Sequence, residues 1–343
     1  MRKITTSADR NISPANIIYF LIFMMLGVLA LWYCFKSINF DEFMENMKSV
    51  NYLYIGLSIL FGFIAFIIRA LRWNILINTL GHRPGVYDTY NAVVTGYIAN
   101  LAIPRIGEIA RCATLYRTNR IPVNSLFGTV VTERIIDMLS LFVIMILVFF
   151  VKMDLFSTFV RERILLPWKP MFESLSLAWI LLIVTAAVIM AIAAWIIFRR
   201  ILRKPSMHRF RTMLTGLADG LKSVLRMKKK LGFIAYTVAI WLCYWLTSYL
   251  VMKALPLTSA LTAADGLLLM VLGSLGWIVP VPGGFGTFHT LIAWGLMMYG
   301  IDFDSGVIFA TLSHESQLLV MLFFGLIALV SVSLTKNKMN QKC

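Results

Sequence analysis

Long, predominantly apolar stretches recur along almost the whole chain. A helix needs about 20 apolar residues to cross a hydrocarbon core about 30 Å thick, and the stretches lack the short alternating pattern of a membrane β-barrel. The pattern therefore predicts an all-α polytopic membrane protein with about six full transmembrane helices. The six predicted spans are about 17–35, 52–71, 126–151, 177–198, 231–253 and 306–334.

Two further apolar regions, about 88–118 and 264–299, are each broken in the middle by proline and glycine. The halves have roughly 14–17 residues, which is short for a separate span. They predict two re-entrant helical hairpins, with two pairs of short full spans as the alternative. The residues that we expect to act as hinges or gates in the breaks are Pro104, Gly107, Pro280, Pro282, Gly283, Gly284 and Gly286.

The distribution of basic residues orients these elements. Cytoplasmic loops of membrane proteins carry an excess of Lys and Arg, and an arrangement with both termini in the cytoplasm satisfies every loop of this chain. The first hairpin then enters from the cytoplasmic side and the second from the opposite side. Such an inverted pair of interrupted segments indicates a transporter-type binding site near the midplane of the bilayer.

The segment of about 207–228 is basic and has apolar residues at helical spacing. It predicts either an amphipathic helix on the cytoplasmic leaflet, in contact with anionic headgroups, or a basic loop that sets topology. We expect residues 1–343 to form a single integral membrane domain. The first apolar stretch is too long for a signal-peptide core and lacks a small-residue cleavage site, so we interpret it as a retained helix.

Composition agrees with this interpretation, because 59% of the residues are hydrophobic and only 14% are charged, against about 25% charged in soluble domains. The net charge of +16 comes from loops beside apolar spans. It therefore indicates topology and contact with anionic phospholipid rather than binding of nucleic acid. The four cysteines have no paired spacing and predict neither a disulfide nor a metal site.

Ionisable residues at membrane depth are candidates for function. Arg105, Glu108 and Arg111 follow the first break at steps of three, which would place them on one helix face with Glu108 paired to either arginine. The remaining guanidinium, together with the amino end of a helix that restarts after Pro104, would bind an anion such as phosphate. The alternative is a self-neutralised ion network that only ties the hairpin to the bundle.

A second polar set, Glu133, Arg134 and Asp137, lies near the start of the third full span. These residues either stabilise a helix start, or partner Arg105 or Arg111, or relay a proton. At the end of the second span, Arg69 and Arg72 precede Trp73 and favour an interfacial anchor, with contact to phosphate headgroups as the alternative.

The glycines of the second break would let either a ligand or a neighbouring helix approach closely. His289 follows this break and is a candidate substrate contact, whereas His314 and Glu315 lie in the last span. Their spacing matches no metal-binding motif, so we expect buried, hydrogen-bonded polar residues and neither a metal nor a cofactor.

An ordered set of motifs spans almost the whole chain: Arg72-Trp73, then residues 104–111 with the pattern P-R-x-G-E-x-x-R, then residues 133–137 with E-R-x-x-D, then residues 282–286 with P-G-G-x-G. In this order and at these distances, the motifs resemble the lysylphosphatidylglycerol synthase transmembrane-region family, also described as flippase-like. Family members that make aminoacylated lipids carry a further soluble aminoacyl-transferase domain. Because the sequence ends soon after its last span, the resemblance implies the lipid-translocating half alone.

These features predict a flippase or transporter of a phospholipid or lipid-linked anionic substrate in a bacterial-type plasma membrane. The expected substrate-binding residues are Arg72, Arg105, Glu108, Arg111, Glu133, Arg134, Asp137 and His289. A Walker loop is missing from the sequence, so ATP would not drive transport directly. The alternatives are a membrane-embedded lipid-head transferase and a non-catalytic partner of a separate synthase, and a homo-oligomer is compatible with each.

Overall fold

The computed structural model describes residues 40–159 and 229–340, part of the segment 25–36, and the single positions 161, 185 and 227. These described residues fold into helices, with no strand among them. In chain order the described helices are α2 (Phe40–Lys48), α3 (Tyr52–Asn78), α4 (Val86–Ala102), α5 (Gly107–Asn119), α6 (Val123–Val151), α7 (Met153–Phe159), α11 (Lys230–Ala254), α12 (Pro256–Ser259), α13 (Ala263–Ile278), the 3-10 turn η3 (Pro282–Gly284), α14 (Thr287–Met297) and α15 (Phe303–Asn340).

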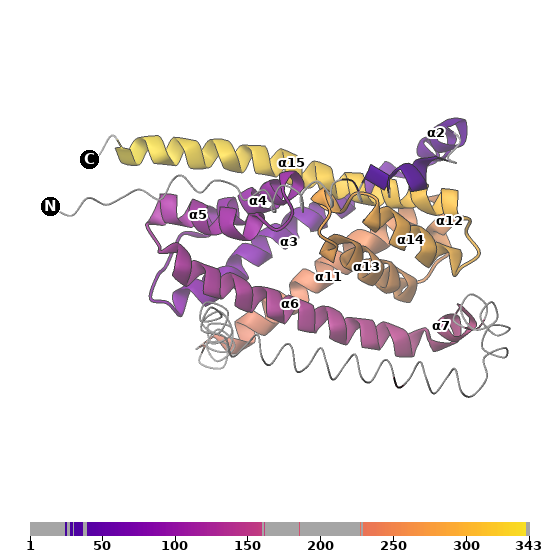
Figure 1. Ribbon diagram of the computed structural model, residues 1–343, viewed down its shortest axis with the longest axis horizontal. Helices are drawn as coiled ribbons and strands as arrows, with labels where there is room; N and C mark the ends of the chain where they lie inside the picture. Colours follow the sequence, from indigo (N-terminus) through magenta and orange to yellow (C-terminus); the bar gives the residue numbers. More distant parts are fainter. Residues whose placement is uncertain are drawn as a thin grey trace.

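Four helices, α3, α6, α11 and α15, are long and apolar enough to cross a membrane. They confirm four of the six predicted spans as helices of sufficient length. Figure 1 shows α6 and α15 running along the long axis on opposite sides of the molecule, and α3 packs extensively against α11 between them. Most of the predicted span 17–35 and all but one residue each of the predicted span 177–198 and the predicted segment 207–228 lie outside the described residues.

The outward faces of the long helices are apolar, as lipid requires. In the most apolar window of α6 only 11% of the residues are buried inside the protein. Phe142, Leu147 and Phe150 are each about half exposed or more on α6, and Phe323 and Val330 are similarly exposed on α15. Exposed apolar area on this scale would be unfavourable in water, so the long helices present surfaces suited to lipid.

Both regions predicted to be broken are pairs of short helices. The first is α4 and α5, with 17 and 13 residues, and the second is α13 and α14, with 16 and 11 residues. In Figure 1 the two pairs occupy opposite halves of the molecule along its long axis. They meet where they break, because the end of α4 contacts η3 and Leu101 lies against Gly283.

Local sequence explains why the helices stop at the breaks. Pro104 has no N–H group to continue α4, and Arg105 adopts a left-handed backbone conformation, with φ at 63°, before α5 begins at Gly107. In the second break, Gly283 and Gly286 have φ angles of 60° and 77°. Glycine adopts such angles without steric strain, so the Pro-Gly sequence encodes this turn directly.

A buried arginine and carboxylate cluster as the candidate functional site

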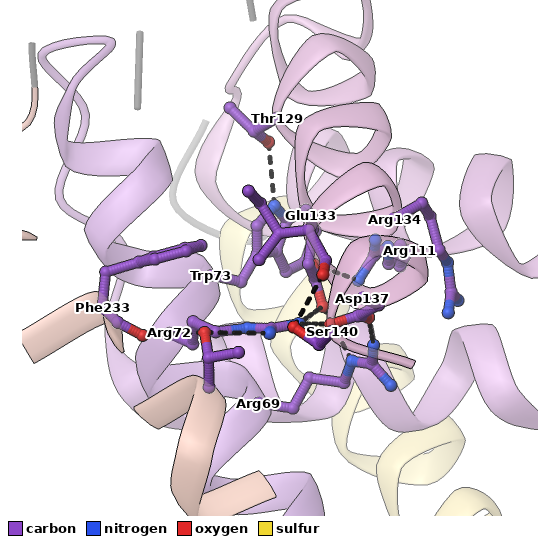
Figure 2. Close-up of polar contacts among 12 residues, drawn as sticks. Arg69, Arg72, Trp73, Arg111, Thr129, Glu133, Arg134, Asp137, Ser140 and Phe233 are labelled. Atoms are coloured by element: carbon purple, nitrogen blue, oxygen red, sulfur yellow. Dashed lines mark hydrogen bonds and ion pairs between the residues drawn. The ribbon is translucent and has the colours of Figure 1, made fainter. Parts of the chain in front are cut away.

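Glu133 on α6 is the centre of the polar site, and its side chain has no exposed surface. Oε1 of Glu133 accepts hydrogen bonds from Nε of Arg69 at 2.7 Å and from Nη2 of Arg72 at 3.1 Å. Oε2 accepts from Nη1 of Arg111 at 2.9 Å. Arg69 and Arg72 belong to α3 and Arg111 to α5, so one carboxylate ties three helices together, as Figure 2 shows.

Asp137 lies one helical turn beyond Glu133 and adds a second carboxylate to the cluster. It pairs with Nη2 of Arg69, and its Oδ1 lies 2.7 Å from Nη2 of Arg72. Nη1 of Arg69 donates to the hydroxyl groups of Tyr97 and Tyr244. A guanidinium group has five N–H donors, and Arg69 makes four hydrogen bonds with them, to two carboxylates and two tyrosines. This arginine is therefore largely saturated by protein groups.

Arg69 and Arg72 are 4% and 0% exposed, respectively. The prediction of an interfacial anchor at the end of the second span is therefore wrong for these two arginines. The last turns of α3 pack beneath α6, where Nη1 of Arg72 also donates to Thr237 of α11 at 3.3 Å. Buried guanidinium groups need carboxylate partners, and Glu133 and Asp137 supply them.

Arg111 has the fewest hydrogen bonds of the three buried arginines, since Arg72 lacks a partner among the described residues only at Nε. Its guanidinium lies 4.6 Å from the centre of the Trp73 ring, a cation–π contact, and only Nη1 is bonded, to Glu133. Nε and Nη2 of Arg111 are buried and have no hydrogen-bond partner among the described residues. Leaving such donors unpaired is costly, so this side chain has capacity for a further acceptor.

Glu108 is placed differently from the prediction. It pairs with Arg134 across α5 and α6, with 3.1 Å between Oε1 and Nε, and not with Arg105 or Arg111. The expected single face of Arg105, Glu108 and Arg111 does not form, because α5 begins only at Gly107. Arg105 is exposed at the tip of the break, where it has no ion pair among the described residues.

A small pocket opens beside the cluster, with a cavity volume of about 10 Å³, which is room for about one water molecule. Its cationic lining comes from Arg69, Arg111 and Arg134, and the α4 and α5 hairpin supplies Gly96, Asn100 and Gly107, among others. The first N–H of α5, on Gly107, already donates to the side chain of Asn100 at 2.6 Å. A ligand in this pocket would therefore meet guanidinium groups first.

Glycine is required where α4 and α5 form this pocket. A Cβ atom on Gly107 would lie 2.1 Å from the carbonyl oxygen of Gly96, and one on Gly96 would lie 2.8 Å from the carbonyl oxygen of Gly107. Real atoms do not approach so closely, so the two glycines allow the backbones of the hairpin to touch. This contact also brings Arg111, one turn into α5, against Gly96 of α4.

The charges of the cluster do not cancel. Four arginines, Arg69, Arg72, Arg111 and Arg134, pair with three acids, Glu108, Glu133 and Asp137. One positive charge is therefore in excess in a largely buried site. Burying an uncompensated charge is expensive, and an anion at the pocket would balance it.

The remaining predicted residue, His289, lies away from this cluster. It is 1% exposed on α14 and its ring centre lies 4.9 Å from that of His314 on α15. The hinge residues of the second break surround the same place, because the carbonyl of Gly283 accepts a hydrogen bond from Nε2 of His314 at 2.8 Å. Two separate polar centres are thus present, one beside each break.

The contacts define a class of protein: a multi-pass helical membrane protein with two pairs of broken helices and a buried arginine-rich centre. The family model described as "Lysylphosphatidylglycerol synthase TM region" matches residues 16–325. The chain therefore belongs to the lysylphosphatidylglycerol synthase transmembrane-region family, which confirms the resemblance inferred from the sequence motifs and indicates a role related to membrane lipids.

A similar curated protein is "UPF0104 membrane protein MJ1595" of Methanocaldococcus jannaschii, which is 26% identical over 177 residues. The match covers 51% of this chain and 48% of that protein, so the chain spans about half the length of the relative it matches. No solved structure matches the chain.

Proposed function

We propose that the protein translocates a phospholipid or lipid-linked substrate with an anionic headgroup across the membrane, and that the headgroup phosphate binds beside Arg111. The observation that carries the proposal is the pair of unbonded donors on Arg111. These buried N–H groups lie at a pocket with excess positive charge. A planar guanidinium binds phosphate through two parallel hydrogen bonds, and the family is associated with a lipid synthase.

In this proposal Arg134 and Arg105 assist Arg111. Arg134 lines the same pocket and its side chain is 37% exposed, so it can receive a headgroup before Arg111 does. Arg105 at the break would attract the headgroup electrostatically. Glu133 and Asp137 hold the arginines in place, Arg72 serves as their fully buried partner, and Glu108 positions Arg134.

The short helices support a re-entrant arrangement in the membrane. At 1.5 Å per residue, α4, α5, α13 and α14 span about 17 to 26 Å, which is less than a hydrocarbon core of about 30 Å. Because the two pairs approach from opposite halves and meet at their breaks, we propose that they form inverted hairpins. The breaks would be the gates of a path for the headgroup.

The distribution of basic residues gives the proposed orientation of the protein in the membrane. Arg83 precedes α4, and Arg117 and Arg120 stand at the end of α5. The last turns of α15, whose sequence includes Lys336 and Lys338, lie at the same end of the molecule as α5 in Figure 1. We therefore place this end, with both termini, in the cytoplasm of a bacterial-type plasma membrane. The protein would act as a transporter without ATP hydrolysis of its own, and not as an enzyme.

The test is lipid movement in liposomes that contain this protein alone. Phosphatidylglycerol with a fluorescent acyl chain is incorporated, and dithionite reduction measures how fast the inner-leaflet probe reaches the outer leaflet. We expect the wild type to accelerate this movement, and Arg111→Lys to lower the rate at least about tenfold, because lysine keeps the charge but loses the two-pronged donor. Arg117→Lys, an exposed position on the same helix, is the matched control and should behave as wild type.

Two results would contradict the proposal. One is that the wild-type protein moves no probe lipid although a cooperative thermal transition shows that it is folded. The other is an Arg111→Lys variant that moves the probe as fast as the Arg117→Lys control. Zwitterionic fluorescent phosphatidylcholine, run in parallel, reports whether the negative net charge of the headgroup matters for recognition. A rate that appeared only after a separate synthase was added would instead support the role of a partner protein.

A further inference from the structure

Three side chains that are far apart in the sequence meet beside the second break. His289 comes from α14, and His314 and Glu315 come from α15. One ligand atom from each, an imidazole nitrogen from both histidines and a carboxylate oxygen from Glu315, lies within 4.8 Å of the other two. The lipid site proposed above uses neither His314 nor Glu315.

The hydrogen bonds of His314 determine which of its nitrogens is free. Nε2 of His314 lies 2.8 Å from the carbonyl oxygen of Gly283. Since a carbonyl can only accept, Nε2 carries the proton, and in the neutral ring Nδ1 presents a lone pair. A histidine that donates one N–H to a backbone carbonyl and turns the other nitrogen inward has the arrangement found in metal ligands.

Glu315 faces this lone pair. Its Oε1 lies 3.0 Å from Nδ1 of His314. Two acceptors at that distance repel each other unless a cation lies between them, and the cation is either a proton on Nδ1 or a metal ion. The third residue favours the metal, because a proton would satisfy only His314 and Glu315 and would leave His289 without a partner.

The unpartnered nitrogen of His289 is the observation that favours a metal ion over a proton. It is 1% exposed, and its Nδ1 is buried with no hydrogen-bond partner among the described residues. Buried imidazole nitrogens normally have a partner. A metal ion shared with His314 and Glu315 would provide one.

The surroundings would hold a metal on one side and leave it open on the other. The rings of Trp277, Phe285 and Phe288 lie with their centres 4.9 to 5.2 Å from that of His314. The side chain of Glu315 is 40% exposed, which provides an entry path. Three protein ligands with an open fourth position is a common arrangement for zinc.

We propose that His289, His314 and Glu315 bind one divalent transition-metal ion, with Zn²⁺ as the best chemical match to two imidazoles and a carboxylate. Tetrahedral ligands at Zn²⁺ distances are about 3.3 Å apart. The ligand atoms of His314 and Glu315 are already close enough, and that of His289, within 4.8 Å of the others, would move by at most about 1.5 Å. The ion would fasten α14 and the Gly283 break to α15. The site shares no residue with the arginine cluster, so metal binding can be measured without any assay of lipid movement.

The experiment measures metal content and binding in protein purified through a tag without histidine. Wild-type protein in detergent, treated with chelator and then dialysed against Zn²⁺, should retain about one ion per chain by mass spectrometry. Glu315→Gln, a partly exposed substitution with little risk to folding, should weaken Zn²⁺ binding at least about tenfold. His289→Gln should do the same, and His82→Gln, a loop histidine outside the site, should bind as wild type.

Zn²⁺ should also raise the thermal transition of the wild type and of His82→Gln but not of Glu315→Gln, and Co²⁺ should give the visible absorption of a tetrahedral site. The proposal is overturned if the wild type retains no more Zn²⁺ than Glu315→Gln and His289→Gln. It is also overturned if Zn²⁺ leaves the thermal transition unchanged, and in that case a proton is the cation between His314 and Glu315. Both measurements are independent of transport.

Discussion

Replacing Glu133 by glutamine should destabilise the protein strongly. The side chain has no exposed surface and accepts from Arg69, Arg72 and Arg111. Glutamine is similar in shape but uncharged, and its one oxygen cannot replace the two that the arginines share. Asp137 would then be the only acid left to balance the three buried arginines.

The magnitude follows from the cost of breaking a buried ion pair while leaving its partner in place. That cost is about 3–5 kcal/mol, and we expect Glu133→Gln to lower the free energy of unfolding by this amount. The same substitution at Glu45, which is exposed and has no ion pair among the described residues, should change it by less than about 0.5 kcal/mol. Reversible unfolding in mixed micelles with increasing SDS measures both variants.

A double variant separates the electrostatic cause from a simple loss of packing. Arg111→Met removes one of the cations that Glu133→Gln leaves unbalanced, so the two changes together should cost at least about 1 kcal/mol less than the sum of the single changes. Additive effects would refute the reasoning, as would a Glu133→Gln variant that is as stable as Glu45→Gln. Either result would mean that the arginines find water or other partners when the carboxylate charge is lost.

Three further predictions concern the breaks and a helix start. Gly107→Ala should lower the thermal transition because its Cβ would lie 2.1 Å from a carbonyl oxygen, whereas Gly128→Ala, which has open space, should leave the transition nearly unchanged or raised. Arg105→Gly should keep or raise stability by relieving a positive φ angle, yet slow lipid movement in liposomes. The backbone N–H of Ser305 donates to Asp302 and lowers the pKa of this carboxyl. The ionised Asp302 therefore stabilises the fold above its unfolded pKa of about 4, and this stabilisation is lost as the pH falls below that value. In thermal transitions measured at a series of pH values, Asp302→Asn should lose less stability on the acid side than the wild type.

The apolar pattern predicted the long helices well because burial in lipid depends on length and composition alone. The predicted span 231–253 differs from α11 by one residue at each end, and the predicted span 126–151 begins three residues after α6 does. The breaks were predictable because Pro104 and the run of glycines after Pro282 cannot continue a helix. The arrangement in space was harder, since nothing local in the sequence states which helices touch.

Arg69 illustrates that difficulty. An arginine at the end of an apolar stretch usually extends to the membrane surface, and only the packing of α3 beneath α6 shows that this one is buried with Glu133 and Asp137. The pairing of Glu108 with Arg134 was missed for the same reason, because spacing along one helix cannot reveal a partner on another. One signal was available: two acids and an arginine within five residues of an apolar helix need partners of opposite charge from elsewhere.

The incomplete bonding of the arginine cluster is the strongest argument that it serves more than structure. A network that only joins helices is most stable when its charges cancel and all its donors are bonded. Here one positive charge is in excess, and two donors of Arg111 are buried without a partner among the described residues. Nε of Arg72 is unpartnered as well, but Arg111 lines the pocket and Arg72 does not. Arg69, by contrast, is bonded to two acids and two tyrosines. The same buried environment therefore saturates one arginine and leaves another with donors to spare, and this difference identifies Arg111 as the residue that receives the anion.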